Sequence, residues 1–221
     1  MGDYSGALRL HERVLEIRKA TLGPKHIRVA GTLNNLGLVY KLTGDYASAI
    51  RLSQRALEIG EKQKDDRFAA MVLGNLAELW ALQGDLERAV EDSSRSVELS
   101  RRLLGPDHPD YAWRLTGLAN LQARKGGESD AEPLFQEVLS VERATWGPEH
   151  PLVGQTLNDL GVFLSSKGRL EEARVSLEEA LEIRRQVLGE GHPQVGLTLD
   201  HLAFVQAKQG DRPEALDSAL K

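Results

Sequence analysis

Apolar positions along this chain recur at the spacing of an amphipathic α-helix. The segment VAGTLNNLGLVYKL, which begins at Val29, places apolar or small residues three and four positions apart, and ASAIRLSQRALEI, from Ala47, repeats this pattern. Residues with that spacing lie on one face of a helix. Gly44 stands between the two segments, with turn residues on either side. The pattern therefore predicts a pair of helices joined by a turn, and we call the first helix A and the second helix B.

The hairpin pattern recurs along the whole chain at a nearly constant step. Six copies of a motif of the type GDYSGA are separated by 42, 40, 42, 42 and 42 residues, and they begin at Gly2, Gly44, Gly84, Gly126, Gly168 and Gly210. A second motif of the type LGPxH keeps the same step, and its copies begin at Leu22, Leu104, Trp146 and Leu188. Between the first and second repeats, EKQKDDR replaces this motif, and Asp65 or Asp66 is expected to cap the next helix there. Fixed-period self-similarity predicts a repeat architecture.

We expect one continuous array over residues 1–221. Its parts are a lone B helix (1–25), four repeats (26–65, 66–107, 108–149 and 150–191) and a partial fifth repeat (192–221).

Small residues recur where two helices of a hairpin are expected to meet. One position of helix A is occupied by Gly37, Ala77, Ala119, Gly161 and Ala203. Twelve residues later, one position of helix B is occupied by Ala49, Ala89, Ala131, Ala173 and Ala215. Small side chains let two helix axes approach closely. A single hairpin cannot bury its own apolar face, so the copies are expected to stack on their neighbours.

These strings resemble tetratricopeptide repeats, and the step of about 42 residues resembles the kinesin-light-chain type. The matching segments are ALEIGEKQK, VLSVERATWGPEHPLVGQTLNDLG and ALEIRRQVLGEGHPQVGLTLDHLA. The resemblance implies an all-α fold, a right-handed superhelical α-solenoid of antiparallel helix hairpins, with the A helices lining a concave face.

The resemblance also implies which residues contact an extended peptide on that face. Carried over position by position, they are Asn34, Asn35, Leu38, Asn75, Glu78, Trp113, Asn120, Asn158, Asp159 and His201. Asn35 and Asn75 match an asparagine that hydrogen-bonds the ligand backbone in peptide-binding members, although both could instead satisfy groups of neighbouring helices. The paired cations that clamp a terminal carboxylate in chaperone-tail binders are absent at the corresponding positions, so that ligand is disfavoured.

Composition narrows the function further. The net charge is −5 with both signs interleaved, which argues against a nucleic-acid partner or an anionic membrane surface. The chain has no cysteine and no apolar run of membrane-spanning length, so we expect a cytoplasmic protein without disulfides. No phosphate loop, zinc-protease helix or nucleophile elbow occurs, and we expect no catalytic residue and no cofactor.

The string LGPDHPDYA, from Leu104, could suggest a metal ligand or a catalytic base at His108. The same histidine recurs once per repeat, as His26, His150 and His192. Residues spaced along an array do not converge on one ion, whereas a tetrahedral metal site needs its ligands about 2 Å from the metal. The glycine can adopt a left-handed conformation that ends helix B, and the proline after the histidine suits the first turn of a helix. We therefore predict a turn role for these histidines and no metal.

Two functional hypotheses follow. The first is a noncatalytic protein-protein interaction scaffold that binds an extended peptide or a partner domain on the concave face. The alternative is a sensor or oligomerisation module of a larger signalling protein whose effector lies outside this chain. The chain closes on EALDSALK, partway through an expected B helix, so the alternative predicts self-association through an uncapped C-terminal end.

Overall fold

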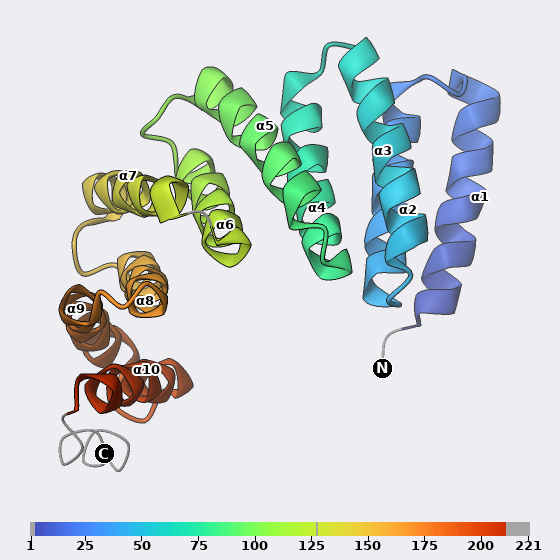
Figure 1. Cartoon of the computed structure of the whole chain (residues 1–221). Helices are drawn as coiled ribbons and strands as arrows, with labels where there is room; N and C mark the ends of the chain where they lie inside the picture. Colours follow the sequence, from blue (N-terminus) through green and yellow to red (C-terminus); the bar gives the residue numbers. More distant parts are fainter. Residues whose placement is uncertain (1–2, 127, 211–221) are drawn as a thin grey trace. The chain divides into compact units, whose positions relative to one another are not determined.

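A computed structural model describes residues 3–126 and 128–210, apart from the side chains of 128–130. In this part of the chain the backbone forms ten α-helices and no strand (Figure 1). The helices are α1 (Tyr4–Leu22), α2 (Ile27–Leu42), α3 (Tyr46–Lys62), α4 (Asp66–Gln83), α5 (Leu86–Leu104), α6 (Pro109–Lys125), α7 (Glu128–Trp146), α8 (Pro151–Ser166), α9 (Leu170–Leu188) and α10 (Pro193–Gln209). The all-α class predicted from the sequence is confirmed.

The helices form two compact units, which we describe separately. Unit 1 is Met1–Gly105 and contains α1 to α5, and unit 2 is Pro106–Lys221 and contains α6 to α10. Within each unit, every helix packs against the helices that precede and follow it in the chain. The even-numbered helices correspond to the A helices of the sequence pattern, and the odd-numbered helices correspond to the B helices. The predicted segment EALDSALK and its Ala215 lie outside the described residues.

Small residues stand at the close contacts inside the hairpins. A β-carbon added to Gly37 would lie 2.8 Å from the Ser53 hydroxyl and 3.1 Å from the backbone oxygen of Ala49. A β-carbon added to Gly161 would lie 2.6 Å from Cγ of Leu177 and 3.2 Å from the backbone oxygen of Ala173. The alanines at the same register are buried, namely Ala77, Ala89, Ala119 and Ala131. The predicted close approach of A and B helices is therefore confirmed at these positions.

The histidines of the second motif begin A helices. In His26, His108, His150 and His192, Nδ1 accepts a hydrogen bond from the backbone N–H two residues later, at 3.1, 3.1, 3.3 and 3.2 Å respectively. Proline follows in the first turn of α6, α8 and α10, where its missing N–H leaves no helix bond unmade. The Trp146 ring stacks on the His150 ring with the centroids 5.2 Å apart. The turn role predicted for these histidines is what the geometry shows.

The glycines that end the B helices differ in one respect from the prediction. Their φ angles are positive, but ψ is 155° at Gly23, 164° at Gly105 and 155° at Gly189, which is far from the left-handed helical value. This extended conformation is open essentially to glycine alone, and it directs the chain away from the helix axis toward the next A helix. At the shorter turn before α4, Lys64 takes a positive φ of 56° instead, and the Asp65 side chain caps the helix by accepting from the Phe68 N–H at 3.0 Å.

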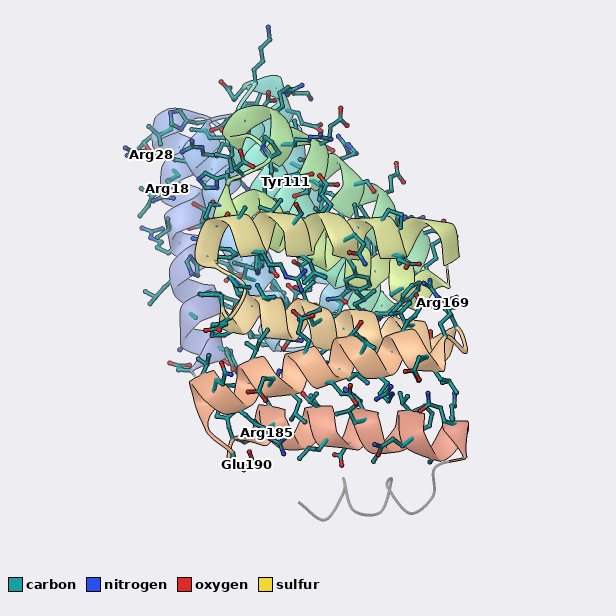
Figure 2. The ribbon with its side chains drawn as sticks, turned by 90° about the vertical axis from the view of Figure 1, so that its left-hand side faces the viewer. Arg18, Arg28, Tyr111, Arg169, Arg185 and Glu190 are labelled. Carbon is teal, nitrogen blue, oxygen red and sulfur yellow. The ribbon has the colours of Figure 1, made fainter. Side chains whose placement is uncertain are left out.

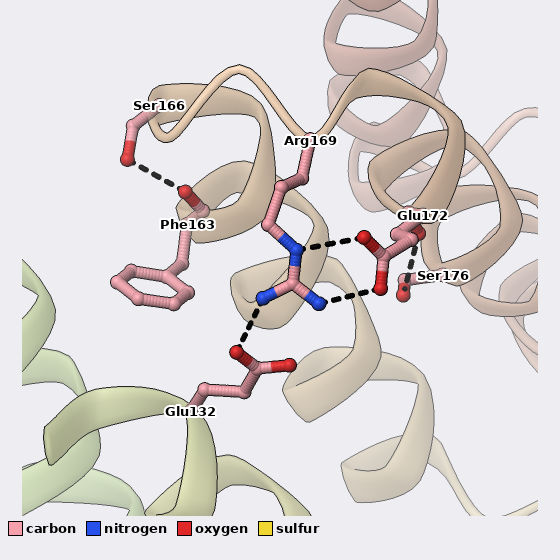
Figure 3. Close-up of polar contacts among 6 residues, drawn as sticks. All are labelled: Glu132, Phe163, Ser166, Arg169, Glu172 and Ser176. Atoms are coloured by element: carbon pink, nitrogen blue, oxygen red, sulfur yellow. Dashed lines mark hydrogen bonds and ion pairs between the residues drawn. The ribbon is translucent and has the colours of Figure 1, made fainter. Parts of the chain in front are cut away.

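Among the B helices whose N-cap the structure describes, α1, α3 and α5 have an aspartate at that position and α9 has an arginine. Asp3, Asp45 and Asp85 each accept a hydrogen bond from the backbone N–H three residues later. Arg169 holds the same place before α9 and makes no cap bond. Its guanidinium instead pairs with Glu172 in the first turn of α9 and with Glu132 of α7 (Figure 3). Arg169 thus connects two consecutive B helices of unit 2.

Each unit has its own apolar interior. In unit 1, the indole of Trp80 is buried between α4 and α5 and donates to the Asp92 carboxylate at 3.1 Å, as expected for a core residue with a polar edge. In unit 2, the rings of Phe135 and Phe163 lie 6.0 Å apart in a core that runs from α6 to α10.

Candidate functional site

All ten predicted peptide-binding residues lie on A helices. We call the surface formed by α2 and α4 the A face of unit 1, and the surface formed by α6, α8 and α10 the A face of unit 2. The A face of unit 1 carries Asn35, Leu38, Lys41, Met71, Asn75 and Glu78. The A face of unit 2 carries Trp113, Asn120, Asp159, Val162, His201 and Phe204.

The three predicted asparagines of unit 1 occupy different environments. Asn35 is exposed on α2. Asn34 is only 3% exposed, and its Oδ1 accepts a hydrogen bond from Nδ2 of Asn75 on α4 at 3.1 Å. Asn75 is half-buried, so its side-chain amide both holds the two A helices together and reaches the surface. The structure thus buries Asn34 and leaves Asn35 and Asn75 on the A face.

A second bond between α2 and α4 lies further along the A face of unit 1. The ammonium of Lys41 forms an ion pair with the carboxylate of Glu78, and both side chains are partly exposed. Leu38 is half-buried on the same face, one helical turn before Lys41. Because this pair bridges neighbouring A helices, it covers part of the space between them.

In unit 2 the predicted residues form a ladder between neighbouring A helices. Asn120 on α6 donates to Oδ2 of Asp159 on α8 at 3.1 Å, and Gln155 donates to Oδ1 of the same carboxylate at 2.8 Å. Trp113 is 70% exposed at the start of this face. Asn158, which is 2% exposed, lies in the interior like Asn34.

A buried arginine on α9 organises the inner side of this ladder. Arg184 is 1% exposed, and its guanidinium donates to Thr198 at 2.6 Å, to Gln155 at 2.7 Å and to Asn158 at 3.3 Å. It also donates to the backbone oxygen of Gln194 at 3.1 Å. A single side chain therefore links α8, α9 and α10. Burial lowers the pKa of Arg184 from its ordinary value, and the nearby Asp159 carboxylate opposes that shift.

Unit 1 has a smaller version of this arrangement. Arg18 on α1 donates to the Thr32 hydroxyl at 2.8 Å and to the backbone oxygen of Arg28 at 3.1 Å. Figure 2 labels Arg18 on α1 and Arg28 on α2. In unit 2, helix α7 carries Glu142 at the register that Arg18 occupies in α1 and Arg184 in α9. Glu142 is 3% exposed, and its Oε2 has no hydrogen-bond partner. Burial raises the pKa of the Glu142 carboxyl; the nearby Thr156 hydroxyl opposes this rise, and the Asp159 carboxylate adds to it.

The network fixes the protonation and orientation of His201. Oδ1 of Asn158 can only accept hydrogen bonds and takes one from Arg184 at 3.3 Å, so Nδ1 of His201, 3.1 Å away, donates to the same oxygen. Burial and then the positive charge of Arg184 lower the pKa of His201, while Asp200 and Asp159 oppose the shift. The ring is therefore neutral at pH 7, and its Nε2 is a hydrogen-bond acceptor.

A pocket opens beside His201 on the A face of unit 2. Its volume is about 300 Å³. It is lined by Val162, Ser165, Ser166, Leu177, His201, Phe204, Val205 and Lys208. Leu177 and Val205 form a buried floor, whereas Val162 and Phe204 are 40% and 55% exposed at the sides. Ligand pockets are typically apolar with a few well-placed polar groups, and this pocket has that character.

Sequence reasoning did not identify several residues of this face. Arg184 and Glu142 occupy buried positions of B helices, where a charged residue in one sequence gives no sign of its partners. Lys208 and the pair Leu177 and Val205 line the pocket, but the pocket depends on how α8, α9 and α10 pack. A comparison of side-chain size between equivalent positions of successive repeats would have identified Leu177 and Val205 as smaller than their counterparts one repeat earlier.

The described residues contain no group of three or more histidine, aspartate and glutamate side chains that could hold a metal ion. Within the same residues, no helix is long and apolar enough to cross a membrane.

Comparison with solved structures shows the same fold in several repeat proteins. BtubC (BKLC) from P. vanneervenii is 22% identical, with a TM-score of 0.82 over 99% of this chain and 89% of that protein. A putative kinesin light chain from Podosopora anserina with nearly identical TPR-like repeats is 23% identical, with a TM-score of 0.76 over 88% and 92% of the two chains. YrrB, described as a TPR protein with an unusual peptide-binding site, is 13% identical, with a TM-score of 0.61 over 94% and 88%.

The sequence itself matches a family profile over nearly its whole length. No curated protein matches the full sequence significantly. The profile described as Tetratricopeptide repeat, however, matches residues 1–62, 68–144, 129–186 and 152–221. The hairpins, the helix caps and the small residues at the helix contacts agree with that match, and the chain belongs to the tetratricopeptide repeat family.

Proposed function

We propose that this chain is a noncatalytic scaffold that binds an extended peptide, or a partner domain that presents one, on the A faces of its two units. Tetratricopeptide repeat proteins are generally noncatalytic and bind protein or peptide partners, and the family membership supports a protein-interaction role. The comparisons give no support to the alternative of a sensor or oligomerisation module.

The observation that carries the proposal is that some asparagines of the A helices are buried and hydrogen-bonded within the protein, whereas Asn35 is exposed. Asn34 and Asn158 lie beneath the surface and hold their neighbours in place. Asn35 follows Asn34 on α2 and is exposed, so its amide can both donate to and accept from a peptide backbone. Fixed polar groups of this kind reduce the entropy lost on binding. The proposed contact residues are Asn35, Leu38, Asn75, Glu78, Trp113, Asn120, Asp159 and His201.

The test is selection of peptides from a displayed random dodecapeptide library on the immobilised full chain, followed by affinity measurement by fluorescence polarisation. For peptides that bind unit 1, Asn35→Ala is expected to weaken binding by about 1–3 kcal/mol if its amide is buried against the ligand. Gln54→Ala, at an exposed position of the B helix α3, is the matched control and should leave the affinity unchanged.

The effect of Asn75→Ala on peptide affinity must be interpreted separately, because this substitution also removes the hydrogen bond to Asn34. Its effect on binding is therefore compared with its effect on the free energy of unfolding. If the library yields no binding peptide, or if no A-face substitution alters the affinity of those that bind, the scaffold proposal fails.

A further inference from the structure

The pocket in unit 2 results from two side chains that are smaller than their counterparts one repeat earlier. Phe135 on α7 and Phe163 on α8 are both buried, and their rings lie 6.0 Å apart. Forty-two residues later, the same register positions hold Leu177 and Val205. Both of these residues line the pocket. Protein interiors are otherwise close-packed. The space that two aromatic rings fill in one repeat is therefore left open in the next, where the smaller Leu177 and Val205 replace them.

In unit 1 the equivalent space is closed in a different way. The residue four positions after the small residue of helix A is Lys41 in α2 and Ser165 in α8. The residue directly after the small residue of the following helix A is Glu78 in α4 and Phe204 in α10. Lys41 and Glu78 form the ion pair that bridges their helices, whereas Ser165 and Phe204 leave the gap uncovered. The pocket is thus a feature of one repeat junction rather than of the repeat pattern.

Two polar groups of the pocket indicate a ligand. Ser165 is 4% exposed, and its hydroxyl has no hydrogen-bond partner although it lines the pocket. A buried hydroxyl without a partner is unusual in a folded protein. Nδ1 of His201 is occupied by Asn158, so Nε2 is the acceptor that the ring offers to a ligand. The orientation of the ring is set before binding, because Asn158 is itself held by Arg184.

The charge of the pocket limits what it can bind. Among the described lining residues no carboxylate occurs, and Lys208 carries the one permanent charge, with its ammonium 4.6 Å from the centroid of the Phe204 ring. A basic side chain of a ligand would be repelled by the Lys208 ammonium, because no carboxylate of the pocket would compensate its charge. An uncharged apolar side chain matches the floor and sides, and a neutral or acidic neighbour matches the rim.

We propose that this pocket is a subsite for one large uncharged apolar side chain of an extended peptide, whose adjoining backbone N–H donates to Nε2 of His201. The subsite rests on the proposed scaffold function and specifies its ligand. An extended peptide meets both requirements, because its backbone N–H groups are unpaired before it binds. A helical face of a second copy could supply an apolar side chain, but its backbone N–H groups are already used within the helix.

The test uses peptides selected from the dodecapeptide library on the full chain, with affinities measured by fluorescence polarisation. Val205→Phe restores the ring that stands at this register as Phe163, so it should fill the pocket and still fold. It is expected to weaken binding about tenfold or more, because the large apolar side chain of the peptide can no longer be buried. Val175→Phe adds the same volume at a 55% exposed position of α9 that does not line the pocket, and it should bind like the parent.

One further protein variant and two altered peptides keep the result independent of core packing. Phe204→Ala removes an exposed side of the pocket and should weaken the same peptides without lowering the thermal midpoint. Replacing the apolar anchor of a selected peptide by lysine should abolish its binding, and a lysine beside the anchor should weaken it. Peptides that bind Val205→Phe and Phe204→Ala as tightly as the parent would overturn the subsite while leaving the scaffold proposal intact.

The acceptor role of His201 has its own readout. Binding should weaken as the pH falls through the folded pKa of His201, below its ordinary 6.5, because protonation turns Nε2 into a donor. Arg184, Asp200, Asp159 and Lys208 also face this region, so the pH profile of His201→Gln is the reference. An identical profile in that variant would refute the acceptor role. A molecular mass that rises with concentration and returns to the monomer value in Val205→Phe would show a second copy as occupant, and would also overturn the proposal.

Discussion

Substitution of Gly161 tests whether close contact between A and B helices limits the stability of unit 2. A β-carbon at this position would lie 2.6 Å from Cγ of Leu177, 2.9 Å from its Cδ2 and 3.2 Å from the backbone oxygen of Ala173. The Leu177 side chain has room to shift, because it lines the pocket. The carbonyl of Ala173 belongs to the α9 backbone and can move only with the helix. Gly161→Ala therefore forces α8 and α9 apart or strains them.

The magnitude follows from two opposing contributions. Alanine is favoured over glycine in a helix interior by about 1 kcal/mol. Overpacking of a close-packed contact costs about 1–3 kcal/mol, and the mobility of Leu177 places this site in the lower part of that range. We expect Gly161→Ala to change the free energy of unfolding by between zero and about 2 kcal/mol, in the destabilising direction.

Gly196→Ala is the matched control. Gly196 lies within α10 of the same unit, and an added β-carbon would meet nothing within 4 Å. This variant should gain the helix preference alone and stabilise the protein by about 0.5–1 kcal/mol. Urea denaturation followed by far-UV circular dichroism measures both variants. If Gly161→Ala stabilises the chain as much as Gly196→Ala does, small residues are not what permits the close helix contact.

Three other substitutions test the polar interior and the helix starts. Glu142→Gln should stabilise the protein at pH 7. Because folding raises the pKa of the Glu142 carboxyl, the parent protein loses stability as the pH rises above the ordinary pKa of 4.5. The gain from Glu142→Gln should therefore vanish in denaturation curves measured below pH 4.5. Arg184→Met should destabilise unit 2 by on the order of 3 kcal/mol, because it leaves buried acceptors without a donor, and an unchanged urea midpoint would contradict the network's role. His150→Ala should cost about 1 kcal/mol of stability through loss of the cap on α8, whereas His150→Asn should retain most of it in the same assay.

Local features of the sequence were sufficient to predict the hairpins. At the turn before α4, for example, the Asp65 side chain accepts from the backbone N–H of Phe68, only three residues away. Such a cap requires no partner that is distant in the sequence. The same holds for the histidine caps and for the small residues, whose position in each repeat is visible as a fixed step. The conformation of Gly105 was only partly predicted, because its positive φ follows from the residue type but its ψ depends on where the next helix packs.

The polar interior of unit 2 could not be predicted, because it depends on contacts between helices. Arg184 and Asn158 are 26 residues apart, and their bond forms only when α9 packs against α8. The peptide-binding positions implied by family resemblance share a helix register, but register alone does not separate Asn34, which is buried, from Asn35, which is exposed on the same helix.

The junctions between A helices show how a repeat protein can acquire a specific site without altering its fold. The Lys41–Glu78 ion pair bridges successive A helices in unit 1, whereas a pocket lies open between α8 and α10 in unit 2. Between these cases, the rings of Phe135 on α7 and Phe163 on α8 pack together at the register that lines the pocket one repeat later. The hairpin contact depends on small residues elsewhere in the helix, such as Gly161, so side chains at these junctions can vary in size and charge while the stacking persists. Selectivity in this chain is therefore expected to lie at the open junction between α8 and α10, beside His201, rather than in the features that all repeats share.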